Sequence, residues 1–180
     1  MNKAIFFDRD GVLNVDKGYT YKTQDLKLFP DVVKALSLLK NEFLFFIVTN
    51  QSGINKGYYT ELDFIKFNTK LVEELGQQGI IIDKTYCCPH TKEENCDCAK
   101  PKIMFAKDAQ EEFYVDLSKS FVIGDHPHDI GFGKNAGCKS IYMLTGHGKK
   151  HQKELKDLKP DFVANSLLEA AEWILKNTEL

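Results

Sequence analysis

Short apolar runs alternate along the chain with longer segments of helical periodicity. Six runs rich in β-branched and aromatic residues predict strands, at 4–7, 43–48, 80–82 (extending toward 86), 121–123, 140–144 and, more weakly, 161–164. Two helical patterns begin after Asp31 and after Thr60. Three others run from Pro101 to Phe113, over about 128–136 and from Leu167 to Leu175. Strands alternating with helices predict a Rossmann-like α/β fold, with a mostly parallel sheet and helices on both faces.

The size and composition of the chain favour one globular domain. Its 180 residues are 43% hydrophobic and 28% charged, the balance of an ordinary globular protein that can bury a core. There is no internal repeat, no low-complexity tract and no linker rich in Pro, Gly or Ser. We therefore expect a single domain over residues 1–180.

The charge and the apolar runs argue against two classes of partner. A formal net charge of −2 offers no general attraction to nucleic acid or to an anionic membrane. The longest purely apolar stretch, 43–48, is far too short to span a bilayer, and no secretory signal precedes Asp8. We expect a cytoplasmic monomer with no nucleic-acid or membrane partner.

Three of the predicted strands end in polar side chains suited to phosphate chemistry. Asp8 and Asp10 follow the first strand, Thr49-Asn50-Gln51-Ser52-Gly53 ends the second, and Asp125 and Asp129 follow the fourth. Singly, each has an ordinary alternative: solvated acids, a turn, or an acidic helix N-terminus. Because the carboxyl ends of parallel strands meet at one edge, all three sets can form a single metal-assisted site.

Four of the five cysteines lie within a dozen residues. Cys88-Pro89-His90 and Cys96-Asp97-Cys98 form two ligand pairs separated by residues 91–95. Three sulfurs and one imidazole predict a closed tetrahedral Zn²⁺ site of the structural type. Cys87 is expected to pack on the opposite side of its strand. A reactive dithiol and unligated thiols are the alternatives.

Together these motifs resemble the haloacid dehalogenase (HAD) superfamily of phosphohydrolases over roughly residues 4–145. The resemblance is carried by Asp8-Arg9-Asp10-Gly11, by Thr49-Asn50-Gln51, by Gly124-Asp125 with Asp129, and by Lys100 in Cys98-Ala99-Lys100-Pro101. Within the superfamily the chain is most similar to the small heptose-bisphosphate and histidinol-phosphate phosphatases, which bind structural zinc. This implies a zinc loop at about 86–101 and, because the 14–29 segment is short, no large cap domain.

The resemblance also implies a role for each motif residue. Asp8 would be the nucleophile, Asp10 the general acid and base, and Thr49, Asn50 and Lys100 ligands of the phosphoryl group. Asp8, Asp125 and the Asp10 carbonyl would hold Mg²⁺, with Asp129 orienting Lys100 or a water on the metal. Further substrate contacts are expected from Asp16, Lys17, Gly18, Tyr19, Gln51, Ser52, Ala99 and His126.

Two positions depart from the family pattern. Ala99 stands where arginine commonly precedes the motif lysine, and His126 stands where lysine or arginine commonly follows the metal aspartate. Arginine is the usual bidentate partner of a second phosphate.

The basic segment 146–151 is expected to be a solvated loop.

The sequence therefore predicts a Mg²⁺-dependent phosphomonoester hydrolase of carbohydrate metabolism. It would act through an aspartyl phosphate on a small phosphorylated metabolite, such as heptose 1,7-bisphosphate. Histidinol phosphate is the alternative substrate. The alternatives of another class are a nucleic-acid end phosphatase and a non-catalytic zinc-stabilised binding module.

Overall fold

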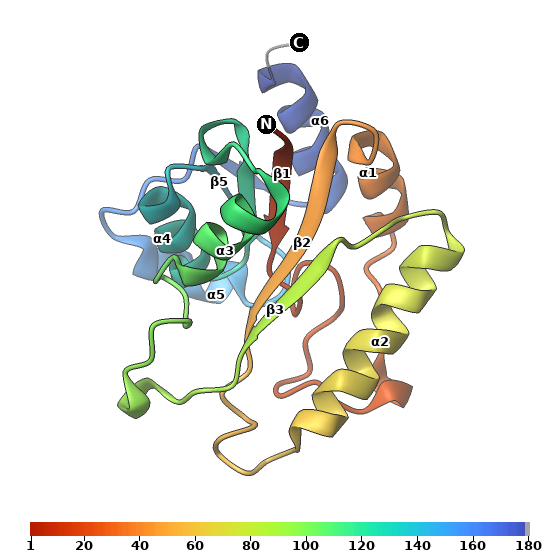
Figure 1. Cartoon of the computed structure of the whole chain (residues 1–180), viewed down its shortest axis with the longest axis vertical. Helices are drawn as coiled ribbons and strands as arrows, with labels where there is room; N and C mark the ends of the chain where they lie inside the picture. The colour runs from red at the N-terminus through yellow and green to blue at the C-terminus, as the bar shows by residue number, and fades with distance from the viewer. Residues whose placement is uncertain (179–180) are drawn as a thin grey trace.

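A six-stranded parallel sheet forms the centre of the computed structural model, which describes residues 1–178 (Figure 1). The strands are β1 (Lys3–Phe7), β2 (Phe43–Asn50), β3 (Lys84–Cys88), β4 (Phe121–Gly124), β5 (Lys139–Met143) and β6 (Phe162–Ala164). They lie in the order β3-β2-β1-β4-β5-β6, and each adjacent pair is parallel. The predicted α/β class is confirmed. A single domain over 1–180 stays a prediction.

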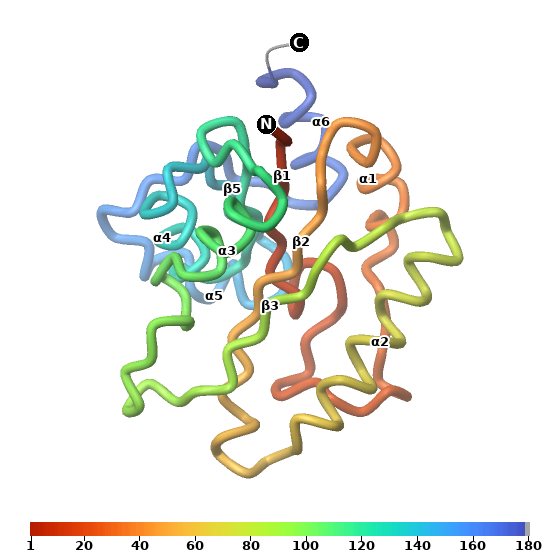
Figure 2. The backbone as a smooth tube through the Cα atoms, in the orientation of Figure 1, coloured from red at the N-terminus to blue at the C-terminus, as the bar shows by residue number. Residues whose placement is uncertain are grey.

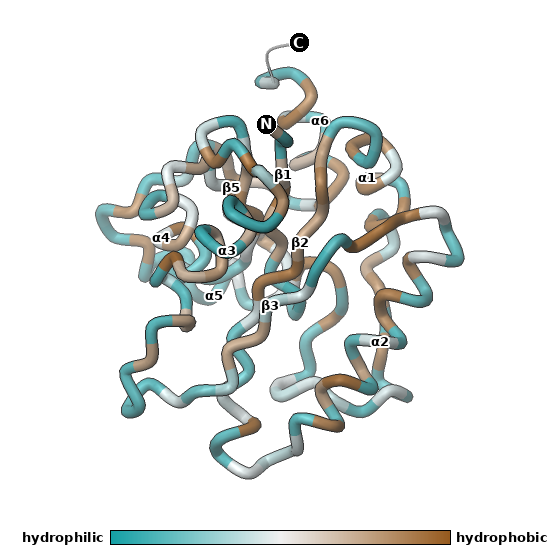
Figure 3. Tube along the Cα trace, in the orientation of Figure 1, coloured by the Kyte–Doolittle hydropathy of each residue, from teal (hydrophilic) through white to brown (hydrophobic). Residues whose placement is uncertain are grey.

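Two apolar cores cover the two faces of the sheet. Successive strand residues point to opposite faces, so Ile5 and Phe7 join one core while Ala4 and Phe6 join the other. The first core is closed by α1 (Val32–Leu39), α2 (Glu61–Gln77) and α6 (Leu167–Asn177), and the second by α3 (Met104–Phe113) and α4 (Pro127–Ala136). Figure 3 shows the hydrophobic residues along the central strands, with hydrophilic residues outside.

Two predicted segments differ from the structure. The 80–82 run is not a strand, because pairing with β2 begins only at Lys84, opposite Phe46. Ile80 is instead buried in the core beyond the end of α2, while Ile81 is exposed. The 146–151 segment is also not a plain solvated loop, since it contains the short helix α5 (Gly148–His151), whose Gly148 is buried.

The loops that follow the strands gather at one end of the sheet. In Figures 1 and 2 the segments after β1, β2 and β3 all extend beyond the same lower edge. The strand order reverses between β1 and β4, which is where open α/β sheets bind ligands. Between β1 and α1 the described chain contains one short 3₁₀ helix, Thr23–Asp25, so this segment forms no cap domain. None of the helices within 1–178 is long and apolar enough to cross a membrane.

Candidate active site and metal cluster

A cavity of about 660 Å³ opens at the carboxyl ends of β1, β2 and β4. That volume suits a small metabolite. The lining includes most of the predicted site residues, namely Asp8, Asp10, Asp16, Gly18, Tyr19, Thr49, Asn50, Gln51, Ser52, Ala99, Lys100, Asp125, His126 and Asp129. His90 and Cys96 of the cysteine cluster also line it. The structure thus brings together residues that lie far apart in the chain, from Asp8 to His147.

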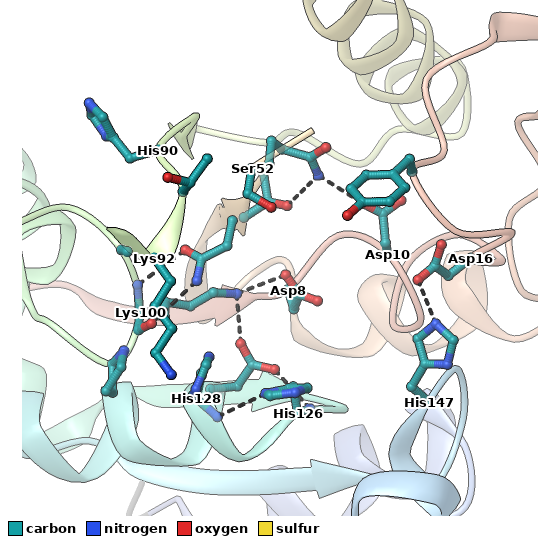
Figure 4. Close-up of a pocket in the computed structure, with 18 of the residues that line it drawn as sticks. Asp8, Asp10, Asp16, Ser52, His90, Lys92, Lys100, His126, His128 and His147 are labelled. Carbon is teal, nitrogen blue, oxygen red and sulfur yellow. Dashed lines mark hydrogen bonds and ion pairs between the residues drawn. The ribbon is translucent and has the colours of Figure 1, made fainter. Parts of the chain in front are cut away.

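Lys100 lies at the centre of this cavity, between two carboxylates. Its Nζ is 2.7 Å from Asp8 Oδ1 and 2.6 Å from Asp129 Oδ1, and it donates a 2.6 Å hydrogen bond to the Val48 carbonyl (Figure 4). Although burial opposes the charged ammonium, the carboxylates of Asp129 and Asp8 raise the pKa of Lys100 above its ordinary value. Lys100 is therefore a fixed, buried positive charge beside Asp8.

Asp8 and Asp125 are two neighbouring carboxylates whose negative charge is disfavoured by burial. Burial raises the pKa of Asp8 to about 7, although the Lys100 ammonium acts in the opposite direction. Burial and the nearby Asp8 carboxylate raise the pKa of Asp125 to about 8. Oxygens of Asp8, Asp125 and Asp129 lie within 4.8 Å of one another. This donor set fits a hard divalent cation, which would relieve the repulsion.

Asp10 is oriented by three donors. Arg9 Nη2 and Gln51 Nε2 each lie 2.8 Å from its Oδ2, and Asn14 Nδ2 donates to its Oδ1 at 2.9 Å. The Arg9 side chain is almost fully buried, with its guanidinium carbon 4.6 Å from the ring centroid of Phe67. Sequence reasoning assigned no role to Arg9 or Asn14. The sequence signal for Arg9 was its position, as a charged residue between the two motif aspartates.

The motif Thr49-Asn50-Gln51 connects the end of β2 to Lys100. The Asn50 side chain accepts a 3.1 Å bond from the Lys100 N–H and donates a 3.3 Å bond to the Lys100 carbonyl. Gln51 Nε2 also donates to Thr49 Oγ1 at 2.7 Å, and the Tyr59 hydroxyl donates to the side-chain oxygen Oε1 of Gln51. Asn50 thus fixes the backbone of Lys100, and Gln51 links Thr49 to Asp10.

Of the four residues expected at 16–19, the structure places three at the cavity. Asp16, Gly18 and Tyr19 line it, whereas Lys17 does not. The Lys17 ammonium is instead paired with Asp25 at 2.8 Å, outside the cavity. Asp16 Oδ2 lies 3.0 Å from His147 Nε2.

His147 belongs to the basic segment that was expected to be solvated. Its backbone N–H donates a 2.7 Å bond to Asp125 Oδ2, and its imidazole lines the cavity. The segment that contains α5 therefore supports the acidic centre. Nothing in the local sequence indicated this, because the contact joins positions 22 residues apart on two different loops.

The two positions that depart from the family pattern also line the cavity. Ala99 offers no charge there. Burial, together with the neighbouring His128 imidazole, lowers the pKa of His126 to about 4, so this side chain is neutral near pH 7. The backbone N–H of His126 donates a 3.0 Å bond to Asp129 Oδ2 at the start of α4. The main chain at His126 therefore orients Asp129, while its side chain does not supply the positive charge of a lysine or arginine.

The cysteine cluster converges as its spacing predicts. The sulfur of Cys98 lies 3.1 Å from that of Cys88, 3.6 Å from that of Cys96 and 3.2 Å from His90 Nδ1. Ligands on a tetrahedral zinc ion with bonds of about 2.3 Å are roughly 3.8 Å apart, so a small outward movement accommodates the ion. Cys87, on the other side of β3, is not part of this group.

Comparisons with known proteins find relatives that match most of the chain. A family model for HAD-hydrolase-like proteins matches residues 97–170. D-glycero-alpha-D-manno-heptose-1,7-bisphosphate 7-phosphatase of Campylobacter jejuni is 40% identical over 160 residues, which are 87% of this chain and 92% of that protein. D-glycero-beta-D-manno-heptose-1,7-bisphosphate 7-phosphatase of Helicobacter pylori is 38% identical over 175 residues, 96% of this chain and 97% of that protein.

A solved structure shares nearly the entire fold. The D,D-heptose 1,7-bisphosphate phosphatase from B. bronchiseptica, complexed with magnesium and phosphate, aligns with a TM-score of 0.87 and 28% identity. The alignment covers 97% of this chain and 98% of that one. This chain therefore belongs to the phosphatases of the HAD-like hydrolase family, alongside the heptose-bisphosphate phosphatases.

Proposed function

We propose that this chain removes one phosphate from a heptose 1,7-bisphosphate, at the 7 position. The observation that carries the proposal is the buried Lys100, held between Asp8 and Asp129 in a cavity where Asp10 is fixed by three donors. The substrate follows from the relatives that are 38% to 40% identical over most of the chain, since their names specify this sugar and this position.

The first step would be attack by Asp8 on phosphorus. A carboxylate oxygen of Asp8 forms the new bond to phosphorus, and the bond from phosphorus to the sugar oxygen breaks. Asp10 gives its proton to the departing sugar oxygen, which leaves as an alcohol. Lys100 and the Thr49 hydroxyl donate to the phosphoryl oxygens, where negative charge is concentrated.

The second step would regenerate the enzyme. Asp10, now a carboxylate, takes a proton from a water molecule that attacks the aspartyl phosphate on Asp8. The bond between Asp8 and phosphorus breaks and inorganic phosphate leaves. Arg9, Gln51 and Asn14 keep the Asp10 carboxyl group in place for both proton transfers.

Magnesium is the cation that we propose for the acidic centre. Asp8, Asp125 and the backbone carbonyl of Asp10 would hold it, and Asp129 would orient Lys100. When bound, Mg²⁺ neutralises the phosphate charge that would otherwise repel the Asp8 carboxylate. The raised pKa values of Asp8 and Asp125 support this assignment, because burial disfavours both negative charges and a bound cation would favour them.

A glycine substitution tests whether Asp125 holds the magnesium. Gly11 has φ +85°, and a Cβ at this position would lie 2.2 Å from Asp125 Oδ2. We expect Gly11→Ala to displace the Asp125 carboxylate and to raise the Mg²⁺ concentration required for half-maximal turnover by about 10-fold or more. The measurement is the Mg²⁺ dependence of phosphate release.

The matched control is Gly137→Ala. Gly137 has φ +78°, but a Cβ there would meet no atom within 4 Å. Both variants should lose about 1 kcal/mol of stability through backbone strain, and Gly11→Ala should lose more through its overlap with Asp125. An equal Mg²⁺ requirement in the two variants would contradict the role of Asp125.

We also propose zinc for the group formed by Cys88, His90, Cys96 and Cys98. The three thiols and one imidazole are the donors that zinc prefers, and all four ligand atoms lie within 4.8 Å of one another. The last residue of the cluster, Cys98, precedes Lys100 by two residues. Zinc would therefore fix the loop that delivers the phosphate-binding ammonium.

The second phosphate of the substrate needs a positively charged partner, which neither Ala99 nor the neutral His126 provides. Lys92, in the zinc loop, lines the same cavity. Within residues 1–178 it has no carboxylate partner among the ion pairs, whereas Lys102 is paired with Asp97 and Lys100 with Asp8 and Asp129. We therefore propose that Lys92 binds the second phosphate group of the bisphosphate.

Phosphate release from a substrate panel tests the proposed activity. The panel contains heptose 1,7-bisphosphate, other sugar phosphates, histidinol phosphate and short 5′-phosphorylated oligonucleotides, each with Mg²⁺ and after its removal. We expect Mg²⁺-dependent release of one phosphate per heptose bisphosphate, with the phosphate at position 1 retained. Preference for histidinol phosphate or for oligonucleotides would overturn the proposed substrate, and absence of release from all of them would overturn the activity.

A further inference from the structure

Four of the five histidines in this chain gather at one side of the cavity. His126 and His128 lie at the start of α4, His147 precedes α5, and His151 is the last residue of α5. The His126 ring centroid is 4.6 Å from that of His128 and 4.7 Å from that of His151, and His147 is 6.0 Å from His151. Figure 4 shows His126, His128 and His147 along this side. The proposed magnesium and zinc sites use none of these four side chains.

A carboxylate completes the group. Glu154 lies in the 3₁₀ helix Gln152–Leu155 that follows α5, and its Oε1 is 2.7 Å from His151 Nδ1. Ligand atoms of His126, His151 and Glu154 all lie within 4.8 Å of one another. Adjacent ligands on an ion with bonds of about 2.0–2.1 Å are roughly 2.9 Å apart in octahedral and roughly 3.4 Å apart in tetrahedral coordination, so the 2.7 Å His151–Glu154 spacing needs only a small outward movement.

We propose that His126, His151 and Glu154 form a third metal site, for a borderline transition-metal cation such as Ni²⁺ or Zn²⁺. Two imidazoles and one carboxylate suit these ions, whereas Mg²⁺ prefers an all-oxygen site. The site lacks sulfur, so it is chemically distinct from the cysteine cluster. It also lies outside the acidic centre formed by Asp8 and Asp125.

The side chains at this site can close around an ion without disturbing the core. The His151 side chain is 20% exposed and that of Glu154 is 57% exposed, so both can move by the small distance that coordination requires. The 3.3 Å bond from the His128 N–H to His126 Nδ1 is long and is lost at little cost. An ion here would fasten the α5 segment to the start of α4.

Nickel binding to the zinc-loaded protein tests the proposal. Calorimetric titration with Ni²⁺ in excess Mg²⁺, which occupies the acidic centre, should give one saturable equivalent per chain. Bound Ni²⁺ should also raise the melting temperature, because it binds only the folded state. Both effects should be lost in His151→Ala. In Glu154→Gln, which changes an exposed side chain and keeps its shape, the affinity should fall about 10-fold or more.

His147→Ala is the matched control, since His147 is near His151 but outside the proposed ligands. It should keep the Ni²⁺ equivalent and the rise in melting temperature. Zinc content and the melting temperature without Ni²⁺ check that each variant folds. Absence of saturable Ni²⁺ binding to the unaltered protein, or unchanged binding in both His151→Ala and Glu154→Gln, would overturn the proposal.

Discussion

Replacing Asp8 with asparagine should lower turnover by at least about 10⁴-fold, within the range that loss of a nucleophile costs covalent hydrolases. The asparagine amide is a poor nucleophile toward phosphorus, and the substitution also removes one of the two negative charges proposed to hold Mg²⁺. Steady-state phosphate release measures the loss. A single-turnover experiment with labelled substrate should give label on Asp8 in the unaltered protein and none in the variant.

A second aspartate provides the control for this experiment. Asp97→Asn makes the same change on a side chain that is 90% exposed, is paired with Lys102 and does not line the cavity. It should keep both turnover and the labelled intermediate. Asp8→Asn should keep its zinc content and fold, since Asp8 contributes nothing to the cysteine cluster. Turnover by Asp8→Asn within about 10-fold of the unaltered protein would rule out Asp8 as the nucleophile.

Local patterns in the sequence were sufficient to predict most of the fold and the position of the site. Five of the six strands lie where apolar, β-branched runs stand, because a strand buried on both faces must be almost continuously apolar. The convergence of Asp8, Thr49 and Asp125 follows from parallel pairing, which places the carboxyl ends of β1, β2 and β4 at one edge. The spacing of the cysteines predicted their cluster in the same way.

The contacts that periodicity does not encode were missed. Arg9 looks like a surface charge in sequence, but it is buried because Phe67 from α2 and the Asp10 carboxylate surround it. The 80–82 run has strand composition, yet Ile80 fills the core without pairing. His147 meets Asp125 only when the loops that follow the adjacent strands β4 and β5 come together. Each case depends on tertiary partners, which override local preference.

Replacing Cys96 with serine should remove bound zinc and lower turnover by about 10- to 100-fold, as changes in the support of a catalytic group commonly do. A serine hydroxyl is a much weaker zinc ligand than a thiolate, and the loop would lose its anchor four residues before Lys100. A loss of about 3 kcal/mol would lower the melting temperature of a protein of this size by roughly 6–12 °C. Metal analysis, a thermal melt and steady-state kinetics measure the three effects.

Cys87→Ser separates the role of the cluster from that of any cysteine in this region. Cys87 is adjacent to Cys88 in β3 but lies outside the group of four ligands. This variant should keep its zinc, its melting temperature to within a few degrees and its turnover.

In Cys96→Ser the loss should appear mainly in kcat, because the Lys100 ammonium would no longer be held beside Asp8 at 2.7 Å during the chemical step. Unchanged zinc content in Cys96→Ser would contradict the ligand assignment. Full turnover after complete loss of zinc would instead show that Asn50, through its two bonds to the Lys100 backbone, positions the lysine without the metal.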